Sequence, residues 1–249
     1  MNKLFKTIVI SGGTSGLGRE LAITLSKENF NVVVLGRKIE SINIYNKIDS
    51  YKLDLTNRNE IHNVCTKIEK KYNKIDILVN SAGVGHFGEL HRLSEEQIIE
   101  SININLIGTI LLTRIVSENM KYHNNGQIIT IESIAAIKGF KYGGAYVASK
   151  FGLAGFNDVL WQELKDYNVK VASILPGLIN TNFLNNLSNE YDLNCALSLK
   201  DIIHAIKCII NQSDTSNISS ITIRPLKKEA HNLFFNILDK ELSIYNPKL

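Results

Sequence analysis

The sequence contains little cysteine and little proline. Only three cysteines, Cys65, Cys195 and Cys208, occur in 249 residues, and their spacing matches neither a disulfide framework nor a metal site. We therefore expect no bound metal and a reduced, cytoplasmic protein. Only three prolines occur, and none belongs to a linker rich in proline or glycine. Together with the chain length, this favours one α/β domain.

Long apolar runs and blocks of one charge are also missing. The most apolar stretch, Leu106–Val116, contains Arg114 and has about half the length of a membrane span. The run that follows the basic start of the chain, Thr7–Ile10, is too short for a signal peptide. The net charge is only +4, and the densest basic stretch, Lys67–Lys74, includes Glu69 within a helical pattern. We expect neither a membrane nor nucleic acid as a partner.

Short β-branched runs alternate with longer helical patterns. Continuous apolar runs are typical of parallel strands that are buried on both faces. Strands are predicted at Phe5–Ile10, Asn31–Leu35, Ile75–Asn80, Gln127–Ile131, Val169–Leu175 and Ile218–Ile223 and, from a less apolar run, at Tyr51–Leu55. Helices are predicted around Leu17, Leu21 and Leu25 and over Asn57–Tyr72, Ser94–Met120, Gly144–Tyr167 and Leu199–Ile210.

This alternation predicts an α/β fold with a single Rossmann-type, doubly wound domain, in which helices flank a mostly parallel seven-stranded sheet. We assign residues 1–225 to the Rossmann-fold domain. Residues 226–249 form a C-terminal extension with an apolar patch, and we expect it to pack on or near the same domain. Ser94 followed by Gln97 predicts a capping box at the start of a long helix.

A glycine-rich loop, Ser11–Gly18, directly follows the first predicted strand. Its spacing is Gly12-x3-Gly16-x-Gly18, which differs from the GxGxxG dinucleotide fingerprint. Glycine permits unusual φ angles and close approach, so backbone amides at the start of the next helix can bind a pyrophosphate. A tight turn without a ligand is the alternative, but the position between a strand and a helix favours a dinucleotide.

The second predicted strand ends in Gly36, Arg37 and Lys38. In dinucleotide-binding folds an acidic residue near this point binds the ribose 2′-hydroxyl, whereas a nearby arginine accommodates a 2′-phosphate. Here Gly36 occupies the expected acidic position and Arg37 follows. A guanidinium group suits phosphate geometry, so the sequence predicts NADP(H) as the cofactor. The alternative is a solvated Arg-Lys pair.

Tyr146 and Lys150 lie four residues apart on a predicted helix. This spacing places both side chains on one helix face. A neighbouring ammonium group favours the phenolate and is expected to lower the pKa of Tyr146, which would suit proton exchange with an alcohol or carbonyl. An exposed surface pair is the alternative for the two residues alone.

Six motifs occur in a fixed order and together resemble the short-chain dehydrogenase/reductase family, in its NADP-preferring branch of about 250 residues. They are Gly12-x3-Gly16-x-Gly18, Asn80-Ser81-Ala82-Gly83, Asn105, Ser133, Tyr146-x3-Lys150 and Pro176-Gly177-x3-Thr181. The resemblance covers Lys6 to Ile223, and Ser133 precedes Tyr146 by 13 residues as in that family.

The resemblance implies a catalytic set of four residues. Tyr146 would be the general acid in reduction and the base in oxidation, and Lys150 would lower its pKa and bind the nicotinamide ribose. Ser133 would hydrogen-bond the substrate oxygen. Asn105 would hold a water that connects Lys150 to solvent. Alone, Ser133 could also be a strand-end hydroxyl that bonds backbone, and Asn105 a residue in a helix kink.

The resemblance also implies a set of cofactor-binding residues. These are Gly12, Thr14, Ser15, Gly16, Leu17 and Gly18 in the loop, Arg37, Asp54 and Leu55 at the adenosine, Asn80, Ala82 and Gly83 beside it, and Tyr146, Lys150, Pro176, Gly177, Ile179 and Thr181 at the nicotinamide. Asp54 could instead be the N-cap of the next helix, although Thr56 could also take that role.

The sequence departs from the family pattern at a few positions. Glu132 precedes Ser133 where a small or neutral polar residue is commoner, and its charge could alter the local field. The chain continues past Arg224-Pro225 without the frequent glycine-rich ending. This resembles members that act on small hydroxy acids, and it casts doubt on a tetramer built through C-terminal strands. A homo-oligomer is expected: a dimer through the helices Ser94–Met120 and Gly144–Tyr167, with a tetramer as the alternative.

The substrate, a small carbonyl or alcohol compound, is expected between three segments: Val84–Phe87, Ile134–Tyr142 and the loop Leu178–Leu197. We interpret His86 as a pocket-lining or exposed loop histidine rather than a catalytic one. Phe183, Leu184, Leu187 and Tyr191 offer an apolar lid. Lys138 and Lys141 could meet an anion or remain solvated.

The leading hypothesis is therefore an NADP(H)-dependent oxidoreductase that interconverts a carbonyl and a secondary alcohol. A non-catalytic NADP(H)-sensing protein is the alternative, although such a sensor needs only the cofactor loop. An epimerase or dehydratase acting on a nucleotide sugar would favour a GxxGxxG loop and a larger C-terminal region, which this sequence lacks. An aliphatic ketone, a hydroxy acid, an acyl thioester and a sugar all remain open as substrates.

Overall fold

The structure is a computed structural model. It describes residues 5–42, 45, 47–181, 183, 193–227, 229–230, 233 and 235–238. Of the expected lid, Phe183 lies within this part, whereas Leu184, Leu187 and Tyr191 lie outside the described residues.

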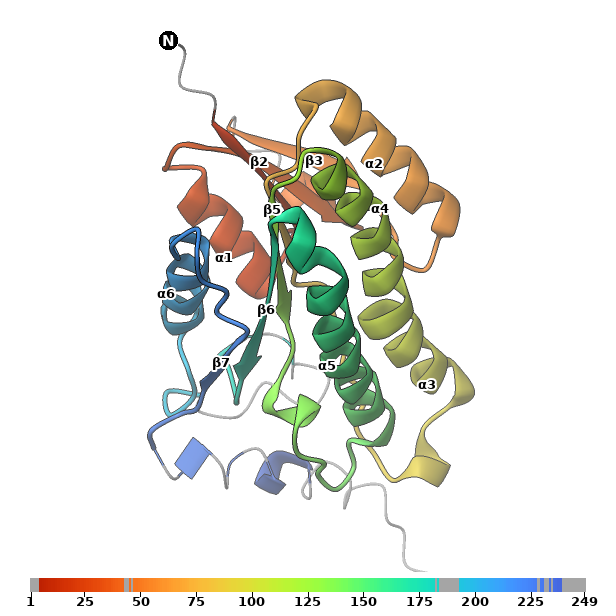
Figure 1. The fold of residues 1–249 in the computed structure, drawn as a ribbon. Helices are drawn as coiled ribbons and strands as arrows, with labels where there is room; N and C mark the ends of the chain where they lie inside the picture. The colour runs from red at the N-terminus through yellow and green to blue at the C-terminus, as the bar shows by residue number, and fades with distance from the viewer. Residues whose placement is uncertain are drawn as a thin grey trace, which may run out of the picture.

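A seven-stranded sheet forms the centre of the fold (Figure 1). The strand order is β3-β2-β1-β4-β5-β6-β7, and every neighbouring pair is parallel. The strands are β1 (Lys6–Ser11), β2 (Phe30–Gly36), β3 (Ile48–Lys52), β4 (Ile77–Asn80), β5 (Gly126–Ile131), β6 (Val169–Pro176) and β7 (Ser220–Ile223). The expected fold class is confirmed. The order reverses beside β1, and such a switch point opens a crevice at the carboxyl ends of the strands.

The third strand differs from the prediction. It was expected at Tyr51–Leu55, but β3 begins at Ile48, which pairs with Val32 of β2. The strand ends at Lys52 because Leu53 donates its amide to the carbonyl of Gly36 and the chain then turns at Asp54. This edge strand contains several polar residues, so it lacks the apolar pattern that would show in the sequence where the strand begins and how it pairs.

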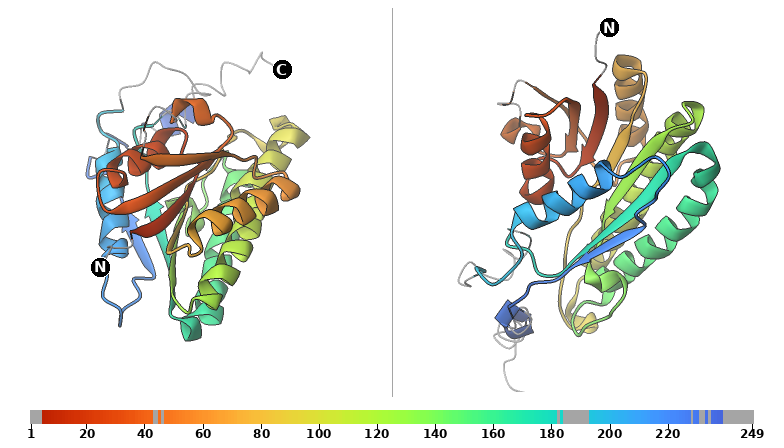
Figure 2. Two further views of the ribbon diagram at one scale, coloured as in Figure 1. Left: turned by 90° about the horizontal axis from the view of Figure 1, so that it is seen from above. Right: turned by 60° about the vertical axis from the view of Figure 1, so that its left-hand side comes forward.

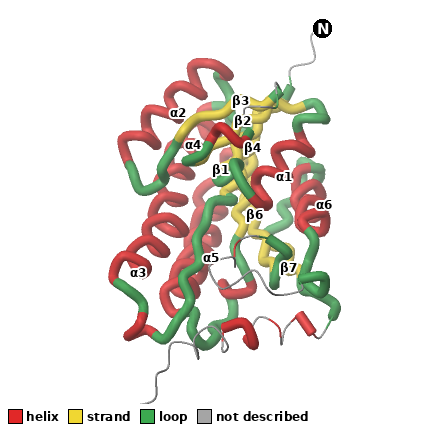
Figure 3. Tube along the Cα trace, turned by 180° about the vertical axis from the view of Figure 1, so that it is seen from behind, coloured by secondary structure: helices red, strands yellow, loops and turns green. Residues whose placement is uncertain are grey.

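Helices cover both faces of the sheet (Figures 2 and 3). One face carries α1 (Gly16–Leu25) and α6 (Leu199–Ile210), and the other carries α2 (Arg58–Tyr72), α4 (Thr109–Tyr122) and α5 (Gly144–Leu164). Each face has its own apolar core: Leu21 and Ile206 belong to the first, and Leu112 and Leu160 to the second. The strands are therefore buried on both sides, as their continuous apolar runs predict.

The helix starts follow side-chain capping. Ser94 and Gln97 form the expected capping box at the start of α3 (Glu95–Ile102). The cap of α2 is Asn57, whose side chain accepts from the amides of Asn59 and Glu60. Neither Asp54 nor Thr56 caps that helix, so both N-cap assignments were wrong. Asp54 instead accepts bonds from the Thr56 amide and hydroxyl.

The predicted helix Ser94–Met120 is interrupted by a turn of π-helix over Asn103–Gly108. Gly108 packs closely against Leu55: a Cβ atom in place of its hydrogen would lie 2.6 Å from the Leu55 carbonyl oxygen. π-Turns of this kind occur frequently at functional sites. The turn places Asn105 in the protein interior.

The helical run Glu95–Tyr122 is long and apolar enough to cross a membrane by length and composition alone. A core helix of a folded domain meets the same criteria. In this fold α4 packs against α2, β4 and β5, which accounts for its apolar face.

The described part of the C-terminal stretch lies beyond the carboxyl ends of β6 and β7 (Figure 1). Ala230, Ile237 and Leu238 are buried. Leu238 belongs to a small apolar cluster with Phe87, Ala135 and Tyr146. This stretch therefore contacts the region in which the predicted catalytic residues meet.

Candidate active site

A cavity of about 1260 Å³ opens at the carboxyl ends of the strands. Most of the predicted site residues line it. They are Gly12, Thr14, Ser15, Gly16, Leu17, Gly18, Arg37, Asp54, Leu55, Ala82, Gly83, Ser133, Tyr146, Lys150, Pro176, Gly177, Ile179 and Thr181. Asn80 and Asn105 do not line it. The sheet thus brings together residues that lie up to 169 positions apart, because parallel strands end at the same edge.

The glycine loop is shaped by close backbone approach. Gly12 has a φ of +68°, and a Cβ atom there would lie 2.7 Å from the Cα of Ala82. A Cβ atom on Gly18 would lie 2.6 Å from the carbonyl oxygen of Gly12. The N-cap of α1, Ser15, makes no side-chain capping bond within the described structure. The first residues of α1, Gly16, Leu17 and Gly18, line the cavity, and the start of a helix is where anions bind.

Arg37 extends from the end of β2 with its side chain 62% exposed. Its guanidinium lies 3.9 Å from a carboxylate oxygen of Glu100 on α3. The pKa of Asp54 is lowered, chiefly by its bond from the Thr56 amide and also by the charge of Arg37. Gly36, in the position where an acid would favour NAD, packs on Thr14: a Cβ there would meet the Thr14 Cγ2 at 2.6 Å. The sequence interpretation of this strand end is therefore compatible with the local packing.

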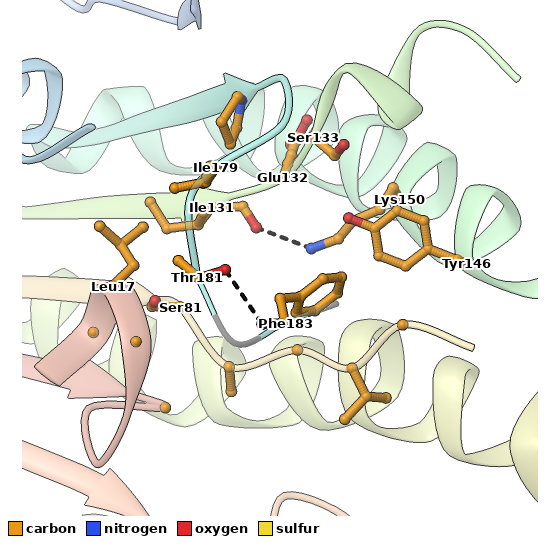
Figure 4. A pocket seen from close by; sticks show the side chains of 18 of the residues that line it. Leu17, Ser81, Ile131, Glu132, Ser133, Tyr146, Lys150, Ile179, Thr181 and Phe183 are labelled. Carbon is orange, nitrogen blue, oxygen red and sulfur yellow. Dashed lines mark hydrogen bonds between the residues drawn. The ribbon is translucent and has the colours of Figure 1, made fainter. Parts of the chain in front are cut away.

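Tyr146 and Lys150 lie side by side on the first turns of α5, facing the cavity (Figure 4). Both side chains are buried. The Lys150 ammonium donates to the Ile131 carbonyl at 3.0 Å and lies 5.8 Å from the centre of the Tyr146 ring. Ser133, two residues after β5, accepts from the Ala135 amide and lies near enough to Tyr146 to act on the pKa of its phenol. Ser133 therefore bonds backbone just after the strand, as the alternative interpretation expects, and it also lies beside the phenol of Tyr146.

Burial controls the titration of this pair. It raises the pKa of Tyr146 to about 12, and the hydrogen bond with Ser133 acts in the opposite direction. It lowers the pKa of Lys150 to about 8, and the charge of Glu132 acts in the opposite direction. The expected lowering of the Tyr146 pKa is not found in this structure, because desolvation of a buried phenol outweighs its hydrogen bond.

Asn105 is buried in the π-helical turn. Its amide group bonds the backbone of Val84 in both directions, at 2.8 and 2.9 Å, and donates to Ser149 at 3.0 Å. A Cβ atom on Gly83 would lie 3.3 Å from the Asn105 Oδ1 and 3.9 Å from the Lys150 Nζ, so Gly83 keeps the space between them open. The helix-kink interpretation is confirmed, and the same residue fixes the loop after β4.

Asn80 occupies a different place from the one expected. It was predicted to line the adenosine, but it is buried and donates to the Thr113 hydroxyl of α4 at 2.9 Å. Its Oδ1 atom has no hydrogen-bond partner in the described part of the chain. This bond joins β4 to α4. It also supplies the hydrogen-bond partner that a buried amide group needs. Its neighbour in the motif, Ala82, does line the cavity.

Two acidic residues were not among the predicted site residues. Glu100 bonds the Nε2 atom of His86 at 2.7 Å and faces Arg37, so His86 lines the cavity as a paired side chain. Glu132 is buried beside the cavity. Their partners lie far away in sequence, and the only available signal was the unusual charge before Ser133. Among the described residues, no group of three acidic, histidine or cysteine side chains is arranged to hold a metal.

Aromatic side chains surround the Tyr146 end of the cavity. Ring centres of Phe87 and Phe183 lie 5.3 and 5.9 Å from that of Tyr146. Phe140 contacts Phe87 on one side, at 6.1 Å, and Phe235 from the C-terminal stretch on the other, at 6.3 Å. Lys138, Lys141, Arg224 and Lys227 also line this end. Phe140 and Phe183 fall within the expected pocket segments, whereas Phe235 comes from the expected extension.

Comparison with known proteins places this site in a family. The family model for short chain dehydrogenases matches residues 6–192. The 3-ketodihydrosphingosine reductase of Bacteroides thetaiotaomicron is 34% identical over 72% of this chain, which spans 66% of that relative. The 3-oxoacyl-acyl-carrier-protein reductase of Thermotoga maritima is 32% identical over 71% of this chain and 75% of its own. The chain belongs to the short-chain dehydrogenase family and is an oxidoreductase.

Solved structures give the same result. A metagenomic short-chain oxidoreductase in complex with NADP superposes with a TM-score of 0.78, is 28% identical, and is matched over 90% of this chain and 99% of its own. Serine dehydrogenase from Escherichia coli has a TM-score of 0.78 and 26% identity, over 87% of this chain and 96% of that one. Both share the fold of this protein.

The crowding at Gly12 yields a stability prediction. Gly12→Ala should destabilise the protein by about 1–3 kcal/mol, because the new methyl group meets backbone at 2.7 Å and φ is positive. Gly144→Ala, at the first residue of α5, has open space and should stabilise by about 0.4–1 kcal/mol. Denaturant unfolding of both variants checks the pair. Equal effects of the two substitutions would contradict the described loop geometry.

Proposed function

We propose that this protein reduces a carbonyl to a secondary alcohol with NADP(H), reversibly, and that Tyr146 is its general acid/base. The observation that carries the proposal is the meeting of Tyr146, Ser133 and Lys150 at one end of a cavity whose other end is the glycine loop. A cofactor-binding protein without catalysis would need only the loop.

The residues at the cavity fit a phosphorylated dinucleotide. Glycine leaves room at Gly12 and Gly18 that a side chain would fill, and the start of α1 offers amides for a pyrophosphate. Arg37 is exposed where a 2′-phosphate would lie. We propose Asp54 and Leu55 near the adenine, and Ile179, Thr181, Pro176 and Gly177 beside the nicotinamide. The NADP in the metagenomic relative supports this choice. When bound, the cofactor supplies or accepts the hydride.

The proton is assigned to Tyr146. Burial raises its pKa to about 12, so the phenol is protonated at neutral pH and can donate to the oxygen of a carbonyl as that oxygen gains negative charge. Ser133 donates a hydrogen bond to the same oxygen in this scheme. In oxidation the proton travels from the alcohol to the phenolate, which the Lys150 ammonium stabilises by its charge.

Lys150 is proposed to have two tasks. It holds a positive charge beside the phenol, and its ammonium is available to the ribose hydroxyls of the cofactor. The open space that Gly83 leaves between Asn105 and Lys150 suits a water, through which the proton lost by Tyr146 is replaced. Asn105 then acts by holding the loop after β4 as well as by bonding that water.

The substrate end is walled by aromatic rings, which favours a carbonyl compound with an apolar substituent. The extension contributes Phe235 and Ala230 to this wall. We therefore propose that the extension, residues 226–249, belongs functionally to the Rossmann-fold domain of residues 1–225. Its described residues Leu226, Lys227, Ala230 and Phe235 line the cavity.

We propose a homodimer in a reducing, cytoplasmic compartment. Ile107, Phe151, Val159 and Trp161 are exposed apolar side chains on the π-turn and α5, the helices expected to pair. Exposed patches of this kind mark contact sites between proteins. The three cysteines are unpaired, which fits the compartment.

Tyr146→Phe tests the proposed acid. The variant should lose at least about a thousandfold in kcat, because it has no proton to donate, while the NADPH Kd stays within about threefold. A carbonyl panel followed by NADPH absorbance, with fluorescence titration for binding, measures both. Tyr122→Phe, at an exposed tyrosine, is the matched control and should be unchanged. Turnover retained in Tyr146→Phe contradicts the assignment. A wild-type protein that binds NADPH but reduces no carbonyl would favour the sensor.

Arg37→Ala tests the cofactor choice. Loss of a charge-assisted bond to a phosphate should weaken NADPH binding by about tenfold or more and leave NADH binding nearly unchanged. Titration of both nucleotides against wild type, Arg37→Ala and Lys38→Ala provides the comparison. An unchanged NADPH/NADH ratio in Arg37→Ala, or a ratio that moves only in Lys38→Ala, would show that Arg37 has another role.

Trp161→Glu tests the dimer. Wild type should sediment as a dimer, and a charge in the proposed interface should shift it to monomer. Tyr122→Glu, at the exposed end of α4, should leave the dimer intact. Sedimentation at several concentrations distinguishes the species, and a monomeric wild type would refute the interface.

A further inference from the structure

Glu132 lies at the junction of β5, α5 and β6 and is only 3% exposed. Its Oε1 atom accepts from the Asn157 amide of α5 at 2.8 Å and from the Ser173 hydroxyl of β6 at 2.6 Å. A buried carboxyl group is costly unless it is hydrogen-bonded and opposed by a positive charge. The structure supplies the hydrogen bonds directly.

The hydrogen bonds around Glu132 form a chain in which each donor leads toward its carboxyl group. Thr130 donates to the Asn157 Oδ1 at 3.3 Å, and Asn157 donates both to Ser173 at 3.0 Å and to Glu132. Ser173, already accepting from Asn157, turns its own hydrogen to Glu132. Two donors, Asn157 and Ser173, therefore meet at the Glu132 Oε1 atom, an arrangement that favours the ionised carboxylate.

The positive charge is that of Lys150. Its ammonium bonds the carbonyl of Ile131, the residue before Glu132. Burial raises the pKa of Glu132, and the bonds from Ser173 and Asn157 and the charge of Lys150 act in the opposite direction. Burial lowers the pKa of Lys150, and the charge of Glu132 acts in the opposite direction. Among the described residues, the titratable groups that face this junction are Tyr146 and Lys150 from α5 and Glu132 from the end of β5.

We propose that Glu132 is a positioning residue: a buried carboxylate, held by Asn157 and Ser173, that supplies the negative charge opposite the Lys150 ammonium. Lys150 is otherwise surrounded by protein that disfavours its charge. The catalytic consequence rests on the proposed function, because the ammonium matters there as the partner of Tyr146. The electrostatic part can be measured without turnover.

The competing explanation is purely structural. Glu132 also ties three elements together, so any substitution could loosen them and lower activity without an electrostatic role. Two variants separate the explanations. Glu132→Gln keeps the shape and one acceptor oxygen but removes the charge, whereas Glu132→Asp keeps the charge and shortens the side chain.

The first experiment follows the lysine CεH₂ signals of the full-length protein by NMR as a function of pH, with Lys150 assigned through Lys150→Arg. The titration midpoint of Lys150 should fall by about one pH unit or more in Glu132→Gln, because an opposite charge is lost. It should move much less in Glu132→Asp. An unchanged midpoint in Glu132→Gln overturns the proposal. Ser173→Ala, which removes one donor from the carboxylate, should lower the midpoint by a smaller amount and serves if Glu132→Gln does not fold.

The second experiment separates this proposal from the proposed function. Reduction needs both Tyr146 and Lys150 in their protonated forms. The alkaline limb of the plot of kcat against pH should therefore move to lower pH in Glu132→Gln and stay in place in Glu132→Asp. A loss of kcat without movement of the limb would support the structural explanation and overturn ours. If Tyr146→Phe remains active while the Lys150 midpoint shifts as expected, the proposed function fails and the Glu132–Lys150 pair stands.

Discussion

The ammonium group of Lys150 is buried in the protein, and the site depends on the cost of placing it there. The Ile131 carbonyl bonds it, and the charge of Glu132 acts on its pKa in the direction opposite to burial. Both partners belong to the end of β5, so the docking of α5 on this strand fixes the lysine and, one turn earlier, Tyr146. A buried charge is tolerated only with such partners, which makes the register of α5 against β5 a condition for the site.

The fold could be predicted from sequence because its signals are local. β-Branched runs marked the strands, and the capping box at Ser94 marked a helix start. The edge strand β3 was misplaced because its partly polar face carries a weak pattern. The π-turn was missed because the apolar pattern of the sequence continues through Asn103–Gly108 and does not distinguish a π-helical turn from an α-helical one.

The site, like the fold, was predictable where its signals are local in the sequence and was not where it depends on contacts between distant segments. Motif order predicted most of the residues that line the cavity, since each motif follows a strand whose carboxyl end the fold fixes. What the order did not contain were partners from distant segments: Thr113 for Asn80, Glu100 for His86, and Asn157 and Ser173 for Glu132. The pKa of Tyr146 also depends on burial, which spacing alone does not reveal.

The proposed cofactor and substrate ends of the cavity are built from different parts of the chain. The glycine loop, Arg37 and Asp54 come from the first strands, whereas the aromatic wall comes from the segments after β4, β5 and β6 and from the C-terminal stretch. Tyr146 lies where the two halves meet. Variation of the wall could therefore change the substrate without disturbing proton transfer.

The account is tested most directly by a crystal structure of the protein with NADP⁺ bound. It predicts the 2′-phosphate at Arg37, the pyrophosphate at the start of α1, and the nicotinamide ring beside Tyr146 with the ribose on Lys150. A nicotinamide outside reach of Tyr146, or a 2′-phosphate away from Arg37, would contradict it.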